Sequence, residues 1–285
     1  MKKTAFVCDS GTGFSVKEIE EMGCFSVPLT VSYDNITKLE NEDINVNQVY
    51  DLMKQGKILK TSLPPLGLIE ELFTKLKNEG YEMIFAVPIC RGLSGTIDAM
   101  QMIANQLEIE FDYFDCNVTA MVELYMTTRS KELYDSGMSI EAIKEVLKKI
   151  SASCNTLIVP YDMQHLRRGG RLSPLAATIA NLLKIKPVLE INERTHGRID
   201  VLEKVRTMSR ALDRTLDQMK KEIPGLGDNY NVTLTHVACE EVAQKLLIKY
   251  QEAFPNAKYS LKKLVSVVGV HTGLNSIAIQ YFYEY

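Results

Sequence analysis

The stretch EMIFAVPICRGLSGTIDAMQMIANQL, residues 82–107, is the part of the sequence that decides the fold. It begins with an almost entirely apolar run, which is typical of a buried strand. It ends with apolar residues at helical spacing, and between the two lie Gly92 and Gly95, which let the chain turn sharply. Because a strand that leads through a tight turn into a helix is the unit of parallel sheets, this stretch predicts an α/β fold.

The first half of the chain repeats this alternation. The apolar periodicity predicts strands at residues 4–8, 25–33, 83–89 and 109–115, and helices at residues 16–23, 45–56, 66–80, 97–107, 119–137 and 139–150. Strands that alternate with helices at this spacing usually form a mainly parallel sheet with helices on its faces. We therefore expect an N-terminal α/β/α domain that spans residues 1–152.

The second half has more strand patterns and fewer helices between them. Strands are predicted at residues 156–161, 185–191, 198–205, 230–238, 259–264 and 265–272, and helices at residues 172–183, 209–222 and 240–254. The segment NERTHGR, residues 192–198, predicts a hairpin-like connection. We expect a C-terminal α+β domain, residues 153–285, with a mixed or antiparallel sheet.

Composition narrows the classes of function. With 33 Lys and Arg against 36 Asp and Glu, the net charge of −3 argues against broad electrostatic binding of nucleic acid. No apolar run is long enough for a signal peptide, and none approaches the roughly 20 residues that span a bilayer. The six cysteines include no CxxC pair, and Cys8, Cys90 and Cys154 lie in apolar runs, where a thiol acts as a small core residue. We expect a cytoplasmic protein.

The turn RGLSGT, residues 91–96, is the first candidate site. Ser94 and Thr96 would present hydroxyl groups, and the start of the following helix would present backbone amides, which together favour an anion. A serine nucleophile is the alternative, so the rival function is an esterase that acts through Ser94 on acyl esters. The hydrolase motif G-x-S-x-G requires a glycine where this chain has Thr96, and one sequence assigns no histidine to Ser94.

A second candidate, CDSGTGF at residues 8–14, could begin a dinucleotide-binding loop. However, Val16 occupies the place of the third glycine of G-x-G-x-x-G, and Asp9 at the strand tip would repel a pyrophosphate. A plain turn or a loop on the substrate side is therefore favoured over a nucleotide site.

For three further segments, the residues alone allow more than one interpretation. The hydroxyls of TSLPP, residues 61–65, either cap the following helix or face those of RGLSGT. HLRRGGRLSP, residues 165–174, is either a solvated surface loop or a basic loop suited to a phosphate or an acidic partner. His271 ends an apolar run, where a lone histidine is more often structural than catalytic, and His236 lies in no zinc-binding spacing, so no metal is expected.

Together and in this order, these motifs resemble the DegV family. The resemblance covers nearly the whole chain and rests on DS at residues 9–10, VPLTVSYDN at 27–35, TSLPP at 61–65, GLSGTIDAM at 92–100, LRRGGRLSPLAATIANLLKIKPVLEI at 166–191, EKVR at 203–206 and GVHTG at 269–273. Membership of this family implies a two-domain α/β protein that holds one long-chain fatty acid between its domains. It implies no cofactor besides that ligand.

The resemblance also implies a partner and a set of site residues. Similar proteins carry the fatty acid for a bacterial fatty acid kinase, whose separate ATP-binding subunit phosphorylates the carboxylate to an acyl phosphate for phospholipid synthesis. The chain would then present a substrate and not itself be an enzyme, with only transient membrane contact. The carboxylate would be held by Thr61, Ser62, Ser94, Gly95 and His271, and Arg171 and Arg206 would contact the partner or a phosphate.

The chain departs from the family pattern beside these residues. The pair Arg91-Gly92 replaces the serine that usually precedes LSGT, Asp115-Cys116 replaces a later DS pair, and Gly273-Leu274-Asn275 replaces GPG. The residues that would hold the carboxylate match the family pattern, whereas the residues beside them differ from it. The acyl chain length and the identity of the kinase partner are therefore left open.

The expected arrangement is a dry tunnel. Burial of an acyl chain contributes about 0.8 kcal/mol per methylene, so the tail would drive retention while a few polar groups fix its direction. The tunnel should lie behind Thr61, Ser94 and His271, and the absence of side chains at Gly92 and Gly95 should leave room for the head group.

Overall fold

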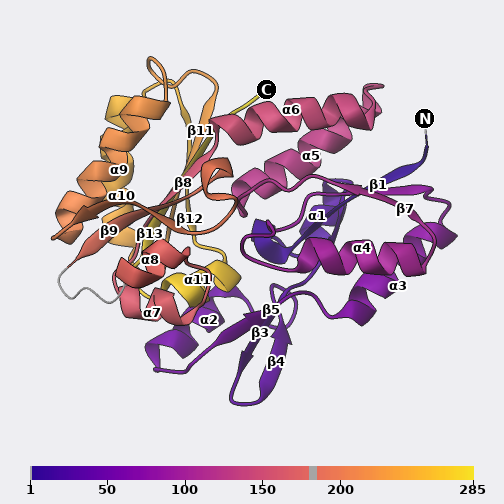
Figure 1. The fold of residues 1–285 in the computed structure, drawn as a ribbon, viewed down its shortest axis with the longest axis horizontal. Coiled ribbons are helices and arrows are strands. Elements are labelled where there is room, and N and C mark those ends of the chain that lie inside the picture. The colour runs from indigo at the N-terminus through magenta and orange to yellow at the C-terminus, as the bar shows by residue number, and fades with distance from the viewer. Residues whose placement is uncertain (1, 180–184) are drawn as a thin grey trace.

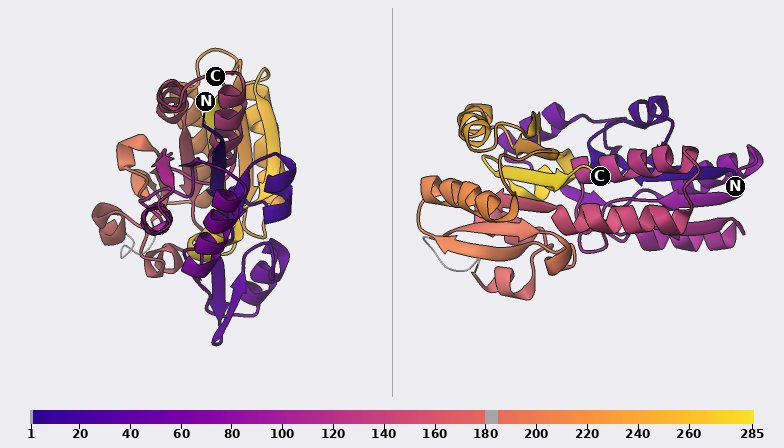
Figure 2. Two further views of the ribbon diagram at one scale, coloured as in Figure 1. Left: turned by 90° about the vertical axis from the view of Figure 1, so that its right-hand side faces the viewer. Right: turned by 90° about the horizontal axis from the view of Figure 1, so that it is seen from above.

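The structure is a computed structural model that describes residues 2–179 and 185–285. In this part of the chain, two main sheets lie side by side along the long axis, and a small third sheet lies below the region where the two halves meet in the view of Figure 1 (Figures 1 and 2). The expected α/β class with two differently built halves is confirmed.

The first main sheet is entirely parallel, in the order β2 (Phe25–Val27), β1 (Thr4–Asp9), β6 (Met83–Ala86) and β7 (Glu110–Tyr113). Helices α3 (Leu66–Asn78) and α4 (Thr96–Gln106) pack on one face, and α5 (Met121–Asp135) and α6 (Ile140–Ser153) pack on the other. Side chains that alternate along β1 divide between these two cores, because Val7 faces α3 and α4 whereas Phe6 faces α5. The predicted α/β/α half is therefore confirmed, with the short helix α1 (Val16–Glu21) beside β2.

The second main sheet has six strands, in the order β10 (Asp200–Val205), β9 (Lys186–Ile191), β8 (Asn155–Val159), β13 (Ile277–Tyr283), β11 (Tyr230–His236) and β12 (Lys258–Lys263). Only β11 and β12 run parallel, so the sheet is mixed, as expected. Helices α9 (Met208–Glu222) and α10 (Glu240–Ala253) cover one face, and the other face belongs to the core shared with the first half. The predicted boundary at residue 152 falls in the last turn of α6.

The third sheet was not predicted. It is antiparallel, in the order β4 (Ile36–Leu39), β3 (Thr30–Tyr33) and β5 (Lys60–Ser62), and α2 (Val46–Lys54) follows it. The single extended segment expected at residues 25–33 is two strands in different sheets, separated at Pro28, which has no amide to donate to a sheet. Thr61 and Ser62 belong to β5 and do not cap α3, whose N-cap residue Pro65 makes no side-chain bond.

Two segments of the second half differ from prediction. Residues 265–272 form no strand; Ser266–Thr272 is the helix α11, because a short apolar run rich in valine fits a buried helix as well as a buried strand. The expected basic loop at residues 165–174 begins inside the helix α7 (Met163–Arg168), and its predicted helix start is confirmed by α8 (Pro174–Ile179). The remainder of the helix predicted up to residue 183 lies outside the described residues.

The three cysteines that were expected to act as core residues do so. All six thiols are free, and those of Cys8, Cys90 and Cys154 are buried. Burial raises the pKa of each of these three thiols, which makes them poor nucleophiles.

In residues 2–179 and 185–285, none of the helices has the length and apolar character needed to cross a membrane.

Candidate functional site

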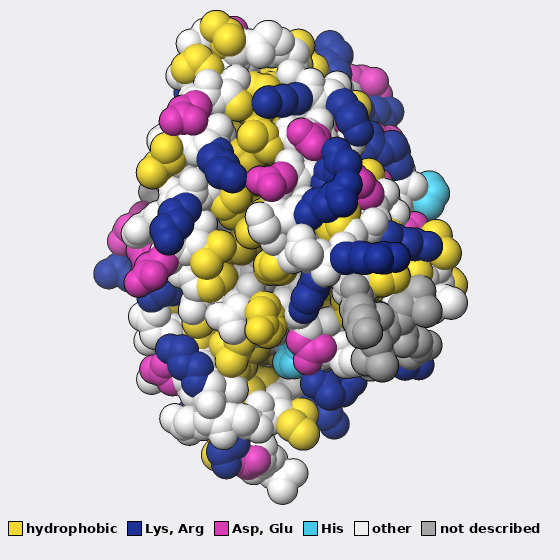
Figure 3. Space-filling model, turned by 90° about the vertical axis from the view of Figure 1, so that its left-hand side faces the viewer, with side chains coloured by type: hydrophobic (Ala, Val, Ile, Leu, Met, Phe, Trp, Pro, Cys, Tyr) yellow, Lys and Arg dark blue, Asp and Glu magenta, His cyan; other side chains and the backbone are white. Residues whose placement is uncertain are grey.

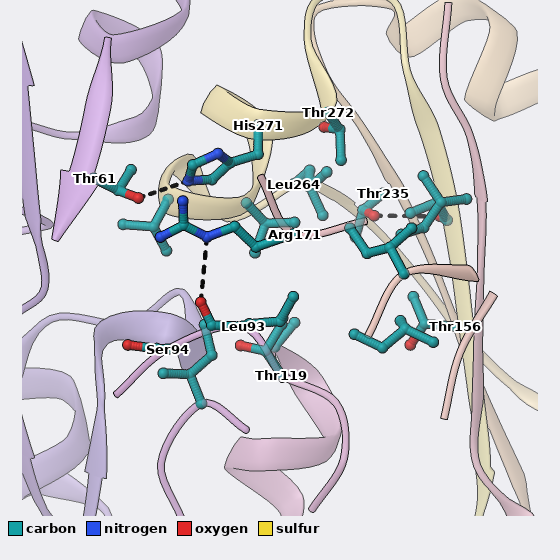
Figure 4. A pocket seen from close by; sticks show the side chains of 18 of the residues that line it. Thr61, Leu93, Ser94, Thr119, Thr156, Arg171, Thr235, Leu264, His271 and Thr272 are labelled. Carbon is teal, nitrogen blue, oxygen red and sulfur yellow. Dashed lines mark hydrogen bonds between the residues drawn. The ribbon is translucent and has the colours of Figure 1, made fainter. Parts of the chain in front are cut away.

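A cavity lies between the two main sheets (Figure 4). About 890 Å³ of its space is free of atoms, and part of this space is open to solvent. Its walls are mainly apolar and come from both halves of the chain, as Ile89, Leu93, Ile158, Ile199 and Leu264 illustrate. This mainly apolar lining suits an apolar ligand.

One end of the cavity carries five of the predicted site residues, and we call this end the mouth. Thr61 and Ser62 reach it from β5, Ser94 from the turn before α4, Arg171 from the loop after α7 and His271 from α11. Figure 4 shows Thr61, Ser94 and the ring of His271 around the same end. The hydroxyls of TSLPP and RGLSGT therefore line one space, although Ser62 and Ser94 are 32 positions apart in the sequence.

His271 is held in a defined position. Its Nε2 lies 2.6 Å from Thr61 Oγ1, and its ring packs so closely on Gly169 that a Cβ there would lie 2.6 Å from Nδ1. Burial, followed by the positive charges of Arg171 and His165, lowers the pKa of His271 to about 4. The imidazole is therefore neutral at pH 7 and can donate or accept one hydrogen bond without carrying charge.

Arg171 supplies the positive charge. Among the described residues that line the cavity, it has the only permanently charged side chain. Its Nη1 donates to the Gly169 carbonyl over 2.6 Å, and its Nε donates to the Leu93 carbonyl over 3.3 Å, so it also ties the turn that carries Ser94 to the second half. An anion at the mouth would meet this guanidinium.

The turn at residues 91–96 is shaped by contact with the second half. A Cβ at Gly92 would lie 2.2 Å from both the carbonyl carbon and the oxygen of Gly197, whereas a Cβ at Gly95 would come no closer than 3.7 Å to Leu63. Position 92 therefore requires a glycine because two backbone segments approach each other closely there. The sequence had suggested a different reason, namely that the head group of the ligand needs space. Ser94 Oγ lies 2.8 Å from Thr96 Oγ1, and Gly95 is the N-cap of α4 without a side-chain cap.

The six-stranded sheet forms another wall, which we call the floor. One row across neighbouring strands is Ile191, Thr156, Gln280 and Thr233, and the next is Ile158, Ala278 and Thr235. These seven residues were missed at the sequence level, because threonine is common in strands and the register that aligns them is set by pairing between distant segments. The floor is therefore partly polar inside a mainly apolar cavity.

Three buried carboxyl groups lie behind the cavity. Glu40 accepts hydrogen bonds from Ser10 Oγ over 2.6 Å and from the Val267 amide over 2.9 Å, and also from the Ser266 hydroxyl, so it caps the start of α11. Burial raises the pKa of Glu40 to about 7 and that of Asp9 to about 6. Burial and the charge of Asp9 also raise the pKa of Glu123.

These carboxyl groups exclude the dinucleotide interpretation of the loop at residues 8–14. The Gly11 amide that would face a pyrophosphate donates instead to Asp9 Oδ1 over 2.7 Å. A Cβ at Gly11 would lie 2.6 Å from Asp9 Oδ1 and 2.9 Å from Glu123 Oε2, so no phosphate fits there. The loop is a buried turn, as the sequence favoured.

Arg206 is not brought to the mouth. It is exposed just after β10 and does not line the cavity. Figure 3 shows Lys and Arg side chains gathered along one side of the face formed by the second half of the chain. Arg171 and Arg206, which the sequence grouped together, therefore lie in different settings.

A wider groove lies outside the mouth and shares Thr61, Arg171 and His271 with it. Its other walls carry the basic side chains of Lys57, Lys60, Arg168 and Lys186. The mouth is thus the point where an apolar cavity meets a basic groove.

Comparisons with known proteins point to one family. The model for an uncharacterised protein of the DegV family matches residues 3–284. A DegV domain-containing protein of Halalkalibacterium halodurans is 29% identical over 286 residues, which covers 100% of both chains. Its similarity therefore extends over both halves and every segment of the mouth.

Two solved structures have the same fold. DegV from Bacillus subtilis, described as a fatty acid binding protein, superimposes with a TM-score of 0.87 at 24% identity. The fatty acid binding DegV family protein SAG1342 from Streptococcus agalactiae superimposes with a TM-score of 0.87 at 26% identity. Each match covers 100% of both chains.

Proposed function

This chain belongs to the DegV family, and we propose that it binds one long-chain fatty acid in the cavity and presents the carboxylate at the mouth to a separate ATP-binding kinase subunit. The product would be an acyl phosphate. The observation that carries the proposal is one mainly apolar cavity whose mouth combines hydroxyl groups, a neutral imidazole and a single guanidinium. The name of the 26% identical streptococcal protein, a fatty acid binding one, supports the ligand class.

The tail supplies most of the affinity. About 14 buried methylenes at about 0.8 kcal/mol each contribute on the order of 11 kcal/mol. Hydrogen bonds to a charged head group add about 1.5–3 kcal/mol each before the cost of desolvation. The mouth therefore decides the direction of the ligand more than the strength of its binding.

The head group is the part that the mouth recognises. A buried carboxylate needs a compensating charge or several hydrogen-bond donors. Arg171 lines the mouth and can supply the charge. Ser94, Thr61 and Ser62 offer hydroxyl donors, His271 offers a neutral ring, and the amide at Gly95 belongs to the start of α4. None of these groups has to act as a nucleophile.

The basic groove is where we place the partner. It begins at the carboxylate end, so a kinase subunit docked there would bring ATP phosphates next to the mouth. The cations of the groove would attract those phosphates. Exposed basic side chains of the second half would extend the contact with an acidic partner surface (Figure 3). Arg206, which is exposed, would be one of the residues that contact the partner.

The esterase alternative gains no support from the geometry. Ser94 Oγ is hydrogen-bonded to Thr96 Oγ1, and His271 Nε2 is paired with Thr61. A serine nucleophile needs a base within hydrogen-bond reach, and in the described part of the chain no histidine is bonded to Ser94. An esterase would also be labelled by a fluorophosphonate and turn over an acyl ester without a partner.

Lipid extraction of the purified protein, followed by mass spectrometry, tests the ligand. We expect one equivalent of a long-chain fatty acid. Protein that carries no lipid, and takes up none from a fatty acid solution, would contradict the proposal.

Two variants test presentation. Ser94→Ala should keep much of the lipid affinity but lower phosphorylation by an added kinase subunit. Arg171→Ala should weaken docking of that subunit in a calorimetric titration, and it should also lower fatty acid affinity because it removes the charge at the mouth. Full turnover with Ser94→Ala, or unchanged docking and affinity with Arg171→Ala, would remove these residues from their roles.

A further inference from the structure

The floor of the cavity changes polarity with distance from the mouth. Ala278 is the second residue of β13 and Gln280 is the fourth, and β13 follows α11 in the chain. The row of Ala278 is therefore nearer to His271, and the row that contains Gln280, Thr156 and Thr233 lies about 7 Å deeper along the strand. Figure 4 shows Thr156 on the opposite side of the cavity from Thr61 and Ser94.

The amide of Gln280 is fixed on both sides. Its Oε1 accepts from the Val122 amide over 3.1 Å, at the start of α5, where the N-cap residue Ala120 has no side-chain cap to offer. Its Nε2 donates to the Thr119 carbonyl over 2.9 Å and to Thr156 Oγ1 over 2.8 Å. Since these bonds join the two halves of the molecule, Gln280 is not free to turn toward a ligand.

The hydroxyl group of Thr156 donates no hydrogen bond to any described residue. Its oxygen accepts from Gln280, and among the described residues no acceptor is bonded to its own hydroxyl proton. The residue is only 9% exposed, and it lines the cavity. Thr235, one row nearer the mouth, donates its hydroxyl proton to the Ala278 carbonyl over 3.2 Å. The oxygen of Thr235 can therefore still accept a hydrogen bond from a donor in the cavity.

A plain hydrocarbon chain cannot satisfy these groups. Methylene groups neither accept nor donate, so a saturated chain that reached Thr156 would remove the hydroxyl from water without replacing the lost hydrogen bond. An oxygen on the chain at that depth would accept the unused proton. Sites built with a hydrogen-bonding group discriminate strongly for ligands that pair with it.

We propose that the inner part of the cavity selects a fatty acid that carries a hydroxyl or keto oxygen on the distal part of its chain, with Thr156 as the donor to that oxygen. This inference rests on the proposed function, since it assumes that the carboxylate lies at the mouth. It narrows the substrate class from long-chain fatty acids in general to oxygenated ones.

The test compares stearic acid with a positional series of monohydroxystearic and monooxostearic acids, by displacement of a fluorescent fatty acid from delipidated full-length protein. We expect at least one isomer with its oxygen far from the carboxylate to bind about 5–10-fold more tightly than stearic acid, as one added hydrogen bond allows. An isomer with the oxygen next to the carboxylate should show no such advantage.

Variants identify the residue. Thr156→Val keeps the shape and removes the hydroxyl, so the advantage should fall below about 2-fold while stearic acid binds at least as tightly as before. Thr156→Ser should retain the advantage. Thr74→Val, at an exposed position on α3, is the control for a threonine-to-valine change outside the cavity.

Three results would overturn the inference. Stearic acid could bind as well as every oxygenated isomer, the advantage could survive in Thr156→Val, or it could be lost in Thr156→Ser despite native circular dichroism. In each of these cases stearic acid still binds, so the proposed function stands. If neither stearic acid nor any isomer binds the wild-type protein, the proposed function fails together with this inference.

Discussion

The mouth of the cavity takes its five side chains from four separate segments, whereas the floor takes all seven of its side chains from one sheet. The mouth therefore exists only while the two halves are packed together, and contacts remote from the ligand hold it in place. The floor is held by paired strands and has no titratable group among its seven residues. Perturbations of packing and of pH should accordingly act on the mouth and spare the floor.

The largest effect is expected from Gly92→Ala. Its Cβ would lie 2.2 Å from backbone atoms of Gly197, and a backbone cannot move aside as the end of a side chain can. We expect the free energy of unfolding in urea to fall by about 3 kcal/mol or more, with loss of fatty acid binding. Gly67→Ala is the matched control, because no heavy atom lies within 4 Å of its added Cβ. Equal stability of the two variants would show that the halves do not need this contact.

This contact also illustrates what the sequence could predict. The turn at residues 91–96 and the helices around it follow from local periodicity, and so do the strands of the parallel sheet. The reason for Gly92 lies in Gly197, which is 105 positions away, and no local pattern contains it. Ser94 was a candidate because of its own turn, whereas the assignment of Thr61, Ser62 and His271 to the same site came from the resemblance to a family.

The wrong prediction for residues 265–272 has the same origin. Valine-rich apolar runs favour a strand locally, but Glu40 accepts hydrogen bonds from Ser266 and from the Val267 amide and so stabilises a helix start. Likewise, the rows of the floor depend on which strands pair and in which register. Packing between distant segments decided the features that the sequence did not reveal.

A second, smaller effect is expected from pH, and at the mouth it arises from His271. Because the pKa of His271 is about 4 in the folded protein and 6.5 ordinarily, the unfolded state binds more protons in the interval between these values. This group therefore removes stability, on the order of 2 kcal/mol, as the pH falls from about 6.5 to 4. Asp9 and Glu40 act in the opposite direction, because their raised pKa values favour proton binding by the folded state.

The contribution of His271 can be isolated by comparison with His271→Gln. The variant should lose less free energy of unfolding than the wild type between pH 6.5 and 4, as measured by urea titrations at each pH. A bound carboxylate should favour the protonated ring, so the lipid-loaded wild type should resemble the variant. Parallel stability curves for the three samples would mean that His271 does not titrate as its burial requires.

A third effect concerns position alone. A Cβ at Gly169 would lie 2.6 Å from His271 Nδ1, so Gly169→Ala should displace the ring and break its contact with Thr61. We expect fatty acid affinity to fall about 10-fold, with little change in stability, since the ring can move toward the open mouth. In a double-mutant cycle, adding His271→Ala to Gly169→Ala should cause almost no further loss. Additive losses would assign Gly169 a role separate from His271.

The smallest effect separates two neighbouring hydroxyls of β5. Thr61 is half-buried and hydrogen-bonded to His271, whereas Ser62 is exposed. Water can replace a ligand oxygen as the hydrogen-bond partner of Ser62 with little loss of free energy. Thr61→Val should therefore lower fatty acid affinity about 5-fold, and Ser62→Ala less than about 2-fold, in the same displacement assay. A larger loss for Ser62→Ala would place the carboxylate outside the ring of His271, toward the basic groove. The mouth would then hold its ligand by exposed groups, and its dependence on the packing of the two halves would be correspondingly weaker.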